Sequence, residues 1–254
     1  MGARSRAMIT LLLLGSTLPL AAADETVEDV ASPWTGSLGL AYLATSGNSD
    51  TTTFGLDFKM ERAPTPWGLE VIAAFNRADE DSVKTAERYL VGVRAKRSLS
   101  ERFDLFAGVS GERDVFAGID PRYVVEAGVL YRALRGPTHL LSFDLGATWT
   151  DETQVQTLPD GAEVETGVDY LGAVAGLAYE WKISDAASFV QRLIFYPNFD
   201  DSDDWRLSSN TGLSAAVNSW LAVKLDYGLR YRSRPIGDND TTDTTTKVSL
   251  VASF

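Results

Sequence analysis

Residues 221–232 read LAVKLDYGLRYR, and every second residue of this stretch is apolar. The alternate positions hold small, polar or charged residues, namely Ala222, Lys224, Asp226, Gly228, Arg230 and Arg232. Successive side chains of a β-strand point to opposite faces of a sheet, so this stretch predicts a strand with one apolar and one polar face. The same alternation recurs in residues 51–61 and 245–254. The chain is therefore expected to belong to the all-β class.

About twelve such segments follow one another along the chain, at 34–45, 51–62, 67–77, 85–97, 102–113, 122–134, 139–150, 166–181, 187–197, 204–217, 220–234 and 244–254. The connections at one end of the segments are short, as in 63–66 and 218–219. Those at the other end are longer, as in 151–165 and 235–243, with the compact 46–50 as an exception. This asymmetry is typical of outer-membrane β-barrels, which have short periplasmic turns and longer outer loops.

A soluble sandwich or barrel would alternate in the same way, so the residue types must decide between the architectures. Glycine is costly within a strand unless something must approach closely, yet the polar face holds Gly39, Gly55, Gly68, Gly92, Gly108, Gly128, Gly146, Gly172, Gly176, Gly212 and Gly228. If that face turns inward, the glycines leave room for long basic side chains. We therefore predict a single antiparallel transmembrane β-barrel of about 12 strands over residues 34–254, with short periplasmic turns and longer acidic outer loops.

Residues 1–23 have the features of a secretory signal peptide. Arg4 and Arg6 precede an apolar run that ends in Ala21-Ala22-Ala23, which fits the small-x-small pattern before a cleavage site. The run is too short to span a membrane, and Pro19 interrupts it. We expect cleavage after Ala23, a short periplasmic leader over residues 24–33, and localisation in the outer membrane.

The composition excludes several classes of function. The chain has 254 residues with 35 acidic and 23 basic side chains, and a net charge of −12 argues against nucleic acid as a partner. It has no cysteine, which rules out disulfides, thiolate metal sites and a cysteine nucleophile. The one histidine, His139, begins the segment 139–150 at a periplasmic turn and points outward. We therefore expect no enzyme and no cofactor.

Three stretches resemble a known family: TSGNSDTTTFGLDF at 45–58, ERDVFAGIDPRY at 112–123 and YRSRPIGDNDTTDTTTKVSLVASF at 231–254. They resemble the YdiY-like salt-induced outer-membrane proteins, a family defined by a domain of unknown function. The resemblance spans roughly residues 34–254, implies an outer-membrane barrel and leaves the activity open. The terminal Phe254, with Leu250 and Ala252 on the same face, also resembles the signal that the barrel-assembly machinery reads.

Acidic residues gather in the six expected outer connections, where 18 acids accompany Lys84 alone: Asp50, Asp79, Glu80, Asp81, Asp114, Asp120, Asp151, Glu152, Asp160, Glu163, Glu165, Asp200, Asp201, Asp203, Asp204, Asp238, Asp240 and Asp243. One interpretation is the binding of divalent cations beside outer-membrane lipids and anionic lipopolysaccharide, densest at Asp200, Asp201, Asp203 and Asp204. The other is simple solvation of exposed loops. The run lacks the glycine and terminal glutamate of an EF-hand loop, which favours solvation.

The inward face leaves three functions open. In the first, the barrel is a narrow passive pore for small, anionic solutes, and mid-strand Lys59, Arg94, Lys224 and Lys247 set its selectivity. In the second, inward acids pair with the bases and close the lumen of an envelope-supporting barrel; these acids include Asp57, Asp104, Glu126, Asp144 and Asp226, with Glu70, Glu112 and Glu180. In the third, loops such as 151–165 act as an adhesin or receptor. The pore is the leading interpretation.

Overall fold

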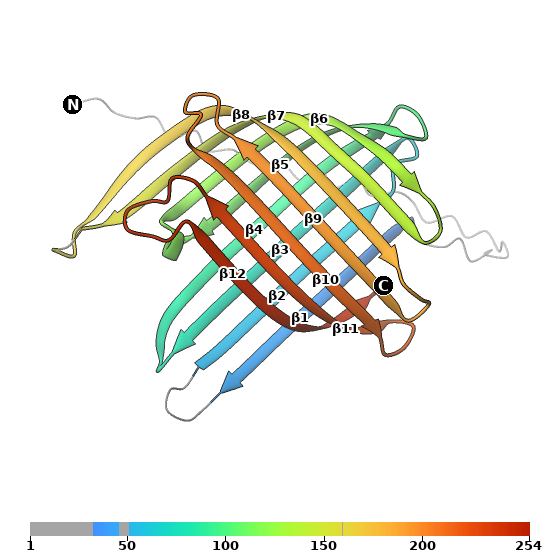
Figure 1. Ribbon diagram of the computed structural model, residues 1–254, viewed down its shortest axis with the longest axis horizontal. Coiled ribbons are helices and arrows are strands. Elements are labelled where there is room, and N and C mark those ends of the chain that lie inside the picture. The colour runs from blue at the N-terminus through green and yellow to red at the C-terminus, as the bar shows by residue number, and fades with distance from the viewer. Residues whose placement is uncertain (1–32, 46–50, 159) are drawn as a thin grey trace, which may run out of the picture. The chain divides into compact units, whose positions relative to one another are not determined.

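Twelve antiparallel strands close into one barrel in the computed structural model, which describes residues 33–45, 51–158 and 160–254 (Figure 1). The strands are β1 (Trp34–Thr45), β2 (Thr51–Arg62), β3 (Trp67–Glu80), β4 (Val83–Ser98), β5 (Phe103–Asp114), β6 (Ile119–Arg135), β7 (His139–Thr157), β8 (Glu163–Lys182), β9 (Ala187–Pro197), β10 (Trp205–Ala216), β11 (Leu221–Arg232) and β12 (Thr242–Ser253). A single turn of 3-10 helix, Val115–Ala117, connects β5 to β6. The predicted fold class and strand number are confirmed.

Each strand pairs with its neighbours in sequence, and β12 returns to pair with β1. We call the end of the barrel at which β1 starts and β12 finishes the turn end, and the opposite end the loop end. The predicted signal peptide and nearly all of the predicted leader lie outside the described residues. In the part of the chain that the structure describes, no helix is long and apolar enough to cross a membrane.

Several strands extend further toward the loop end than the sequence predicts. β3 and β4 are joined by only two residues, Asp81 and Ser82, whose φ angles are 48° and 66°. Positive φ at both central positions matches the twist of the flanking strands and allows a tight hairpin. β7 and β8 likewise continue as a long hairpin. The expected loops 78–84 and 151–165 are therefore mostly strand.

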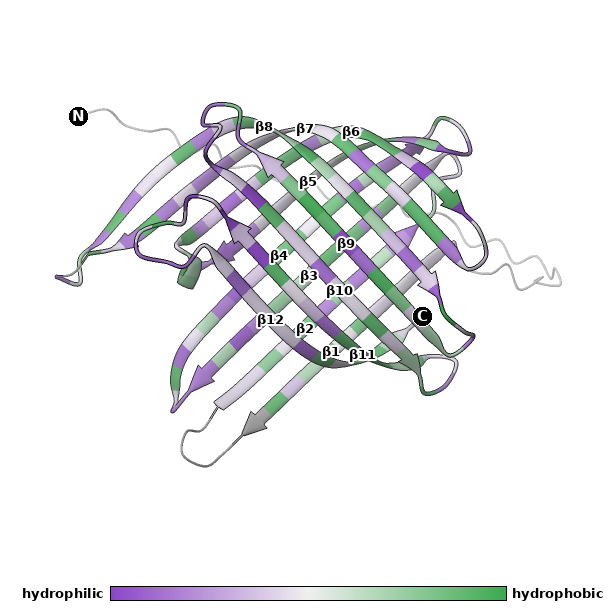
Figure 2. Cartoon of the chain, in the orientation of Figure 1, coloured by the Kyte–Doolittle hydropathy of each residue, from purple (hydrophilic) through white to green (hydrophobic). Residues whose placement is uncertain are grey.

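Hydrophobic and hydrophilic residues alternate along many of the strands in Figure 2, so the two faces of the wall differ in polarity. Large apolar side chains cover the outside; Leu145 and Leu171, for example, are 62% and 60% exposed. Aromatic rings pair on this surface, with ring centroids 4.7 Å apart for Trp205 and Tyr231. An apolar surface of this extent is unfavourable in water and fits a hydrocarbon environment, so the strands present their apolar face to a bilayer.

The inward glycines serve two purposes. Gly55 leaves room for a long side chain, because a Cβ there would lie 3.0 Å from Cδ of Lys247. Gly128 and Gly146 are instead partners on β6 and β7, and a Cβ on Gly128 would lie 2.2 Å from the carbonyl oxygen of Leu145. The predicted role of glycine in accommodating basic side chains therefore holds at Gly55, whereas Gly128 permits close approach of two backbones.

The barrel closes through a short seam between β1 and β12. Cα partners run only from Ser37 and Ser253 to Leu40 and Leu250. Beyond Leu40, β1 continues to pair with β2 as far as Thr45, and β12 pairs with β11. The two terminal strands are therefore joined at the turn end and separate toward the loop end.

Candidate functional site: the barrel lumen

The lumen holds a cavity of about 710 Å³ in its loop-end half. Residues of β2–β6 and β9–β12 line it, together with Pro235 and Ile236 from the connection between β11 and β12. A second cavity of about 310 Å³ lies at the turn end, beside Pro137, Ser188 and Ser214. Among the described residues, none lines both cavities. A layer of side chains therefore separates them.

Arg94, near the middle of β4, lines the large cavity. Its guanidinium forms ion pairs with Glu126, at 2.6 Å, and with Asp144, at 2.7 Å, and it stacks over the ring of Phe106 at 4.4 Å from the ring centroid. Phe106 packs in a buried apolar cluster with Leu130 and Val174. Paired charges and an apolar cluster therefore lie side by side inside the barrel at this level.

A second set of charges lies below Arg94, toward the turn end. Lys96 binds Glu70 at 2.9 Å and Glu61 at 3.1 Å, and Lys59 also binds Glu61, at 2.8 Å. On the neighbouring strands, Asp104 is completely buried and accepts hydrogen bonds from both terminal nitrogens of Arg132. Each of these buried charges has a partner of opposite sign, which offsets the cost of removing it from water.

The remaining predicted lumen residues are paired as well. Lys224 binds Asp226 at 2.8 Å, and Lys247 forms an ion pair with Asp57. The structure thus places all nine predicted pore residues on the inner face, and each belongs to an ion pair: Asp57, Lys59, Arg94, Asp104, Glu126, Asp144, Lys224, Asp226 and Lys247. Their role in selectivity remains a prediction.

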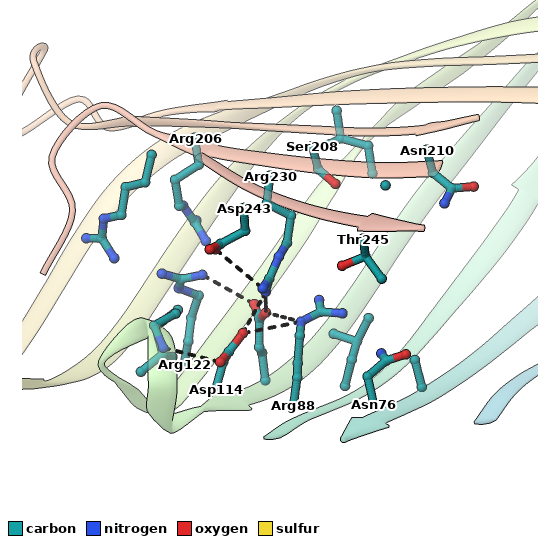
Figure 3. Close-up of a pocket in the computed structure, with 18 of the residues that line it drawn as sticks. Asn76, Arg88, Asp114, Arg122, Arg206, Ser208, Asn210, Arg230, Asp243 and Thr245 are labelled. Carbon is teal, nitrogen blue, oxygen red and sulfur yellow. Dashed lines mark hydrogen bonds and ion pairs between the residues drawn. The ribbon is translucent and has the colours of Figure 1, made fainter. Parts of the chain in front are cut away.

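A further group of charges surrounds the large cavity at the loop end (Figure 3). We call it the outer arginine cluster, and it consists of Arg88, Arg122, Arg206, Arg230 and Arg232. Glu112 lies among three of these arginines, 2.7 Å from Arg88, 3.2 Å from Arg122 and 3.4 Å from Arg230. Asp114 binds Arg230 at 2.7 Å.

Glu152 connects the cluster to β7. It is 1% exposed and accepts hydrogen bonds from Arg122 and, at 2.8 Å, from Arg232. The sequence analysis assigned Glu152 and Asp114 to the acidic outer loops, and this was wrong, because the strands continue past the predicted ends and carry both side chains into the barrel. Thr148, Thr150 and Glu152 occupy every second position of β7 and therefore point to the same, inner face. Continuing the alternation past residue 150 would have predicted the inward position of Glu152.

Arg206 on β10 differs from the other arginines of the cluster. Its side chain makes no hydrogen bond or ion pair to any residue that the structure describes, and its guanidinium lies over the ring of Tyr196, 5.0 Å from the centroid. The sequence left open whether Gln191 or Arg192 points inward. The structure resolves this, because Arg192 lines the cavity, whereas Gln191 does not and forms hydrogen bonds with Ser209 and Thr211.

The acidic run between β9 and β10 does not converge on a common centre. Arg234 binds both Asp201 and, at 3.0 Å, Asp203, and Asp204 lies 3.5 Å from Arg232. Asp200 donates its backbone N–H to Asn198 instead. No group of three or more potential metal ligands is found in the described part of the chain. Cation binding at these loops remains a prediction.

Two more predicted positions lie at the turn end. Nδ1 of His139 is 2.9 Å from the hydroxyl of Tyr179, and its ring stacks against Trp181, so it belongs to an outer aromatic group as expected. The backbone of Phe254 exchanges hydrogen bonds with Gly36, and its ring is 69% exposed. Its role as an assembly signal remains a prediction.

The chain is similar in fold to solved bacterial porins and translocators. The match to the NanC porin includes 86% of this chain and 98% of that protein, at 12% identity and a TM-score of 0.50. The match to the translocator domain of the autotransporter NalP from Neisseria meningitidis includes 87% of this chain and 87% of that domain, at 10% identity and a TM-score of 0.47. Because the sequence identity is low, the likeness to the NanC porin supports the fold and not a shared function.

Sequence comparison identifies the family. The uncharacterized protein YdiY of Escherichia coli (strain K12) is 29% identical over 229 residues, which cover 85% of this chain and 83% of that protein. The family model described as a protein of unknown function, DUF481, matches residues 38–254. The chain therefore belongs to the DUF481 family, as its resemblance to YdiY-like proteins predicted.

Proposed function

We propose that this protein is a passive channel of the outer membrane, a narrow pore for small, anionic solutes without enzymatic activity. The observation that carries the proposal is the cavity of about 710 Å³ in the loop-end half of the barrel, lined by charged side chains from nine strands or connections around the lumen. A cavity lined by charged side chains inside a wall with an apolar exterior gives a polar solute a place to lie within the membrane.

The separating layer around Arg94 controls passage from the large cavity to the small one. A twelve-stranded barrel is narrow enough for long side chains to reach across part of its lumen. Arg94 and Glu126 line the large cavity and Asp144 lines neither cavity, so we place the constriction at these three side chains, and a solute passes only when they move apart. The pore therefore has a low conductance, and large solutes are excluded.

The preference for anions follows from which charges lack partners. Arg192 and Arg206 line the cavity, and neither forms an ion pair with a described carboxylate. The inward carboxylates Glu112, Asp114 and Glu152 are already bound to other arginines. Among the described lining carboxylates, Asp240 in the connection between β11 and β12 forms no ion pair, so two unpaired arginines accompany one unpaired acid. Unpaired positive charge in a confined space raises the local concentration of anions.

Single-channel recording of the refolded protein in a planar bilayer with a potassium chloride gradient tests the proposal. We expect a small, steady conductance whose reversal potential indicates preference for chloride. The double variant R192Q/R206Q, which removes both unpaired arginines, should shift the reversal potential in the direction that indicates preference for potassium. Arg113, which pairs with Asp120 on the exposed side of the wall, supplies the matched control R113Q, and its reversal potential should stay unchanged.

A sealed structural barrel is the second candidate, favoured by the observation that the two cavities share no lining residue among those described. Absence of conductance from a correctly folded sample would support it and contradict the pore.

Location is tested separately: N-terminal sequencing of the protein from isolated outer membranes should begin at Asp24 if the predicted signal peptide is removed.

A further inference from the structure

Arg206 holds an unused set of hydrogen-bond donors at the edge of the large cavity. An arginine side chain carries five N–H donors in a planar fork, and Arg206 donates none of them to a described residue. Its strand partners are Tyr196, over whose ring it stacks, and Arg232, which is also positive. Like charges directly opposite each other are unfavourable, and whereas Arg232 is bound to Glu152, Arg206 has no carboxylate partner among the described residues.

Arg122 offers a second unused donor to the same space. This arginine is 6% exposed, and its Nε and Nη1 bind Glu152 and Glu112. Its Nη2 is buried and has no hydrogen-bond partner. Arg122 acts electrostatically on Arg206, and Figure 3 shows both side chains pointing into the cavity from opposite walls.

Neutral polar side chains continue from Arg206 along β10. Ser208 and Asn210 follow at every second position and therefore face the lumen at intervals of about 7 Å. Thr245 lies on the same inner face two strands away. The side chains of these three residues make no hydrogen bonds to described groups, and all three line the cavity. This row of hydroxyl and amide groups suits the hydroxyls of a ligand whose charged end lies at Arg206.

We propose that the large cavity binds a small hydroxylated carboxylate, with its carboxylate between Arg206 and Nη2 of Arg122 and its hydroxyls along Ser208 and Asn210. A carboxylate matches the planar fork of arginine and supplies the acceptors that both side chains lack. The cavity volume of about 710 Å³ lies within the range of small-molecule sites. This inference rests on the proposed preference for anions and names the solute class.

Calorimetric titration of the refolded full chain in detergent tests the site without any need for conduction. Gluconate is the probe, hexanoate is a carboxylate of similar length without hydroxyls, and inorganic phosphate is an oxyanion without a carbon chain. We expect gluconate to bind more tightly than either. R206Q should weaken gluconate binding about tenfold or more, because charge-assisted hydrogen bonds are lost. R206K, which keeps the charge, should recover part of the affinity.

The variant S208A should weaken the binding of gluconate and leave that of hexanoate unchanged. R113Q, outside the lumen, should bind gluconate like the wild type, and heat-dependent gel mobility confirms the folding of every variant. Equal affinity of wild type and R206Q, or no binding of gluconate by the folded wild type, overturns the site. Phosphate binding as tightly as gluconate overturns the assignment of a hydroxylated acid.

Conductance separates this inference from the proposed function. A protein that conducts chloride but does not bind gluconate keeps the pore and loses the site. A protein that binds gluconate through Arg206 and never conducts keeps the site and loses the pore.

Discussion

Lys247 on β12 forms an ion pair with Asp57 on β2, across the intervening strand β1. The lysine reaches over β1 because Gly39 and Ala41 present small residues to the lumen there. Lys247 lies beyond the last direct pairing of β1 with β12, at Leu40 and Leu250, whereas Asp57 is level with Gly39 inside the seam. The pair therefore joins the two sides of the barrel's shortest strand junction.

K247A should lower the free energy of unfolding in lipid vesicles by about 1 kcal/mol. The reason is that the ion pair of Lys247 with Asp57 is partly shielded from water and, among the described residues, crosses the seam between β1 and β12. Urea titration followed by tryptophan fluorescence measures the change. K182A is the control, since Lys182 forms an exposed pair with Asp185. If D57A and K247A together cost the sum of their single effects, the two residues are not coupled.

E152Q should destabilise the barrel by about 3 kcal/mol, because it removes one negative charge from between two buried arginines while keeping the volume. Arg122 and Arg232 would then repel each other without a shared counter-ion. The midpoint of urea unfolding in vesicles gives the measurement. E163Q, at the exposed start of β8, should leave the midpoint unchanged, and an equal effect of both changes would contradict the assigned role of Glu152.

R94A should raise the single-channel conductance severalfold and shift selectivity toward cations. The substitution truncates a long side chain that lines the large cavity and leaves Glu126 and Asp144 without their shared arginine. Planar bilayer recordings of conductance and reversal potential measure both effects. R135A changes an exposed arginine near the turn end and should alter neither. A conductance identical to that of the wild type would show that Arg94 does not restrict the lumen.

G128A should prevent stable folding of the barrel, because the new Cβ would lie 2.2 Å from the carbonyl oxygen of Leu145, which belongs to the backbone and cannot rotate away. G228A is the matched control on the same inner face, where the nearest heavy atom is 3.8 Å from the added Cβ. Heat-dependent gel mobility after refolding measures the folded fraction. Equal yields of the two variants would contradict the close approach of β6 and β7.

The number of strands and their two faces were predictable from the sequence because alternation is a local property. In residues 221–232, the position of each apolar residue in the alternation predicts the face to which it points. The strand pairs with β10 and β12 in an unbroken register up to Tyr231, so this alternation is kept along its length. The ends of the strands were less predictable. The long hairpin of β7 and β8 holds polar residues on both faces beyond the apolar band, so the loss of apolar alternation at residue 150 did not mark its end.

The sequence by itself determined the class of fold, the inward position of the charges and the family. Only the tertiary structure decided which of those charges are paired. Arg230 and Glu112 are 118 residues apart, and Lys247 and Asp57 are 190 apart, so closure of the barrel brings them together and no local pattern encodes the contact. The four basic residues predicted to select anions all have carboxylate partners, whereas Arg206 does not, because its strand neighbours are an aromatic ring and a second arginine.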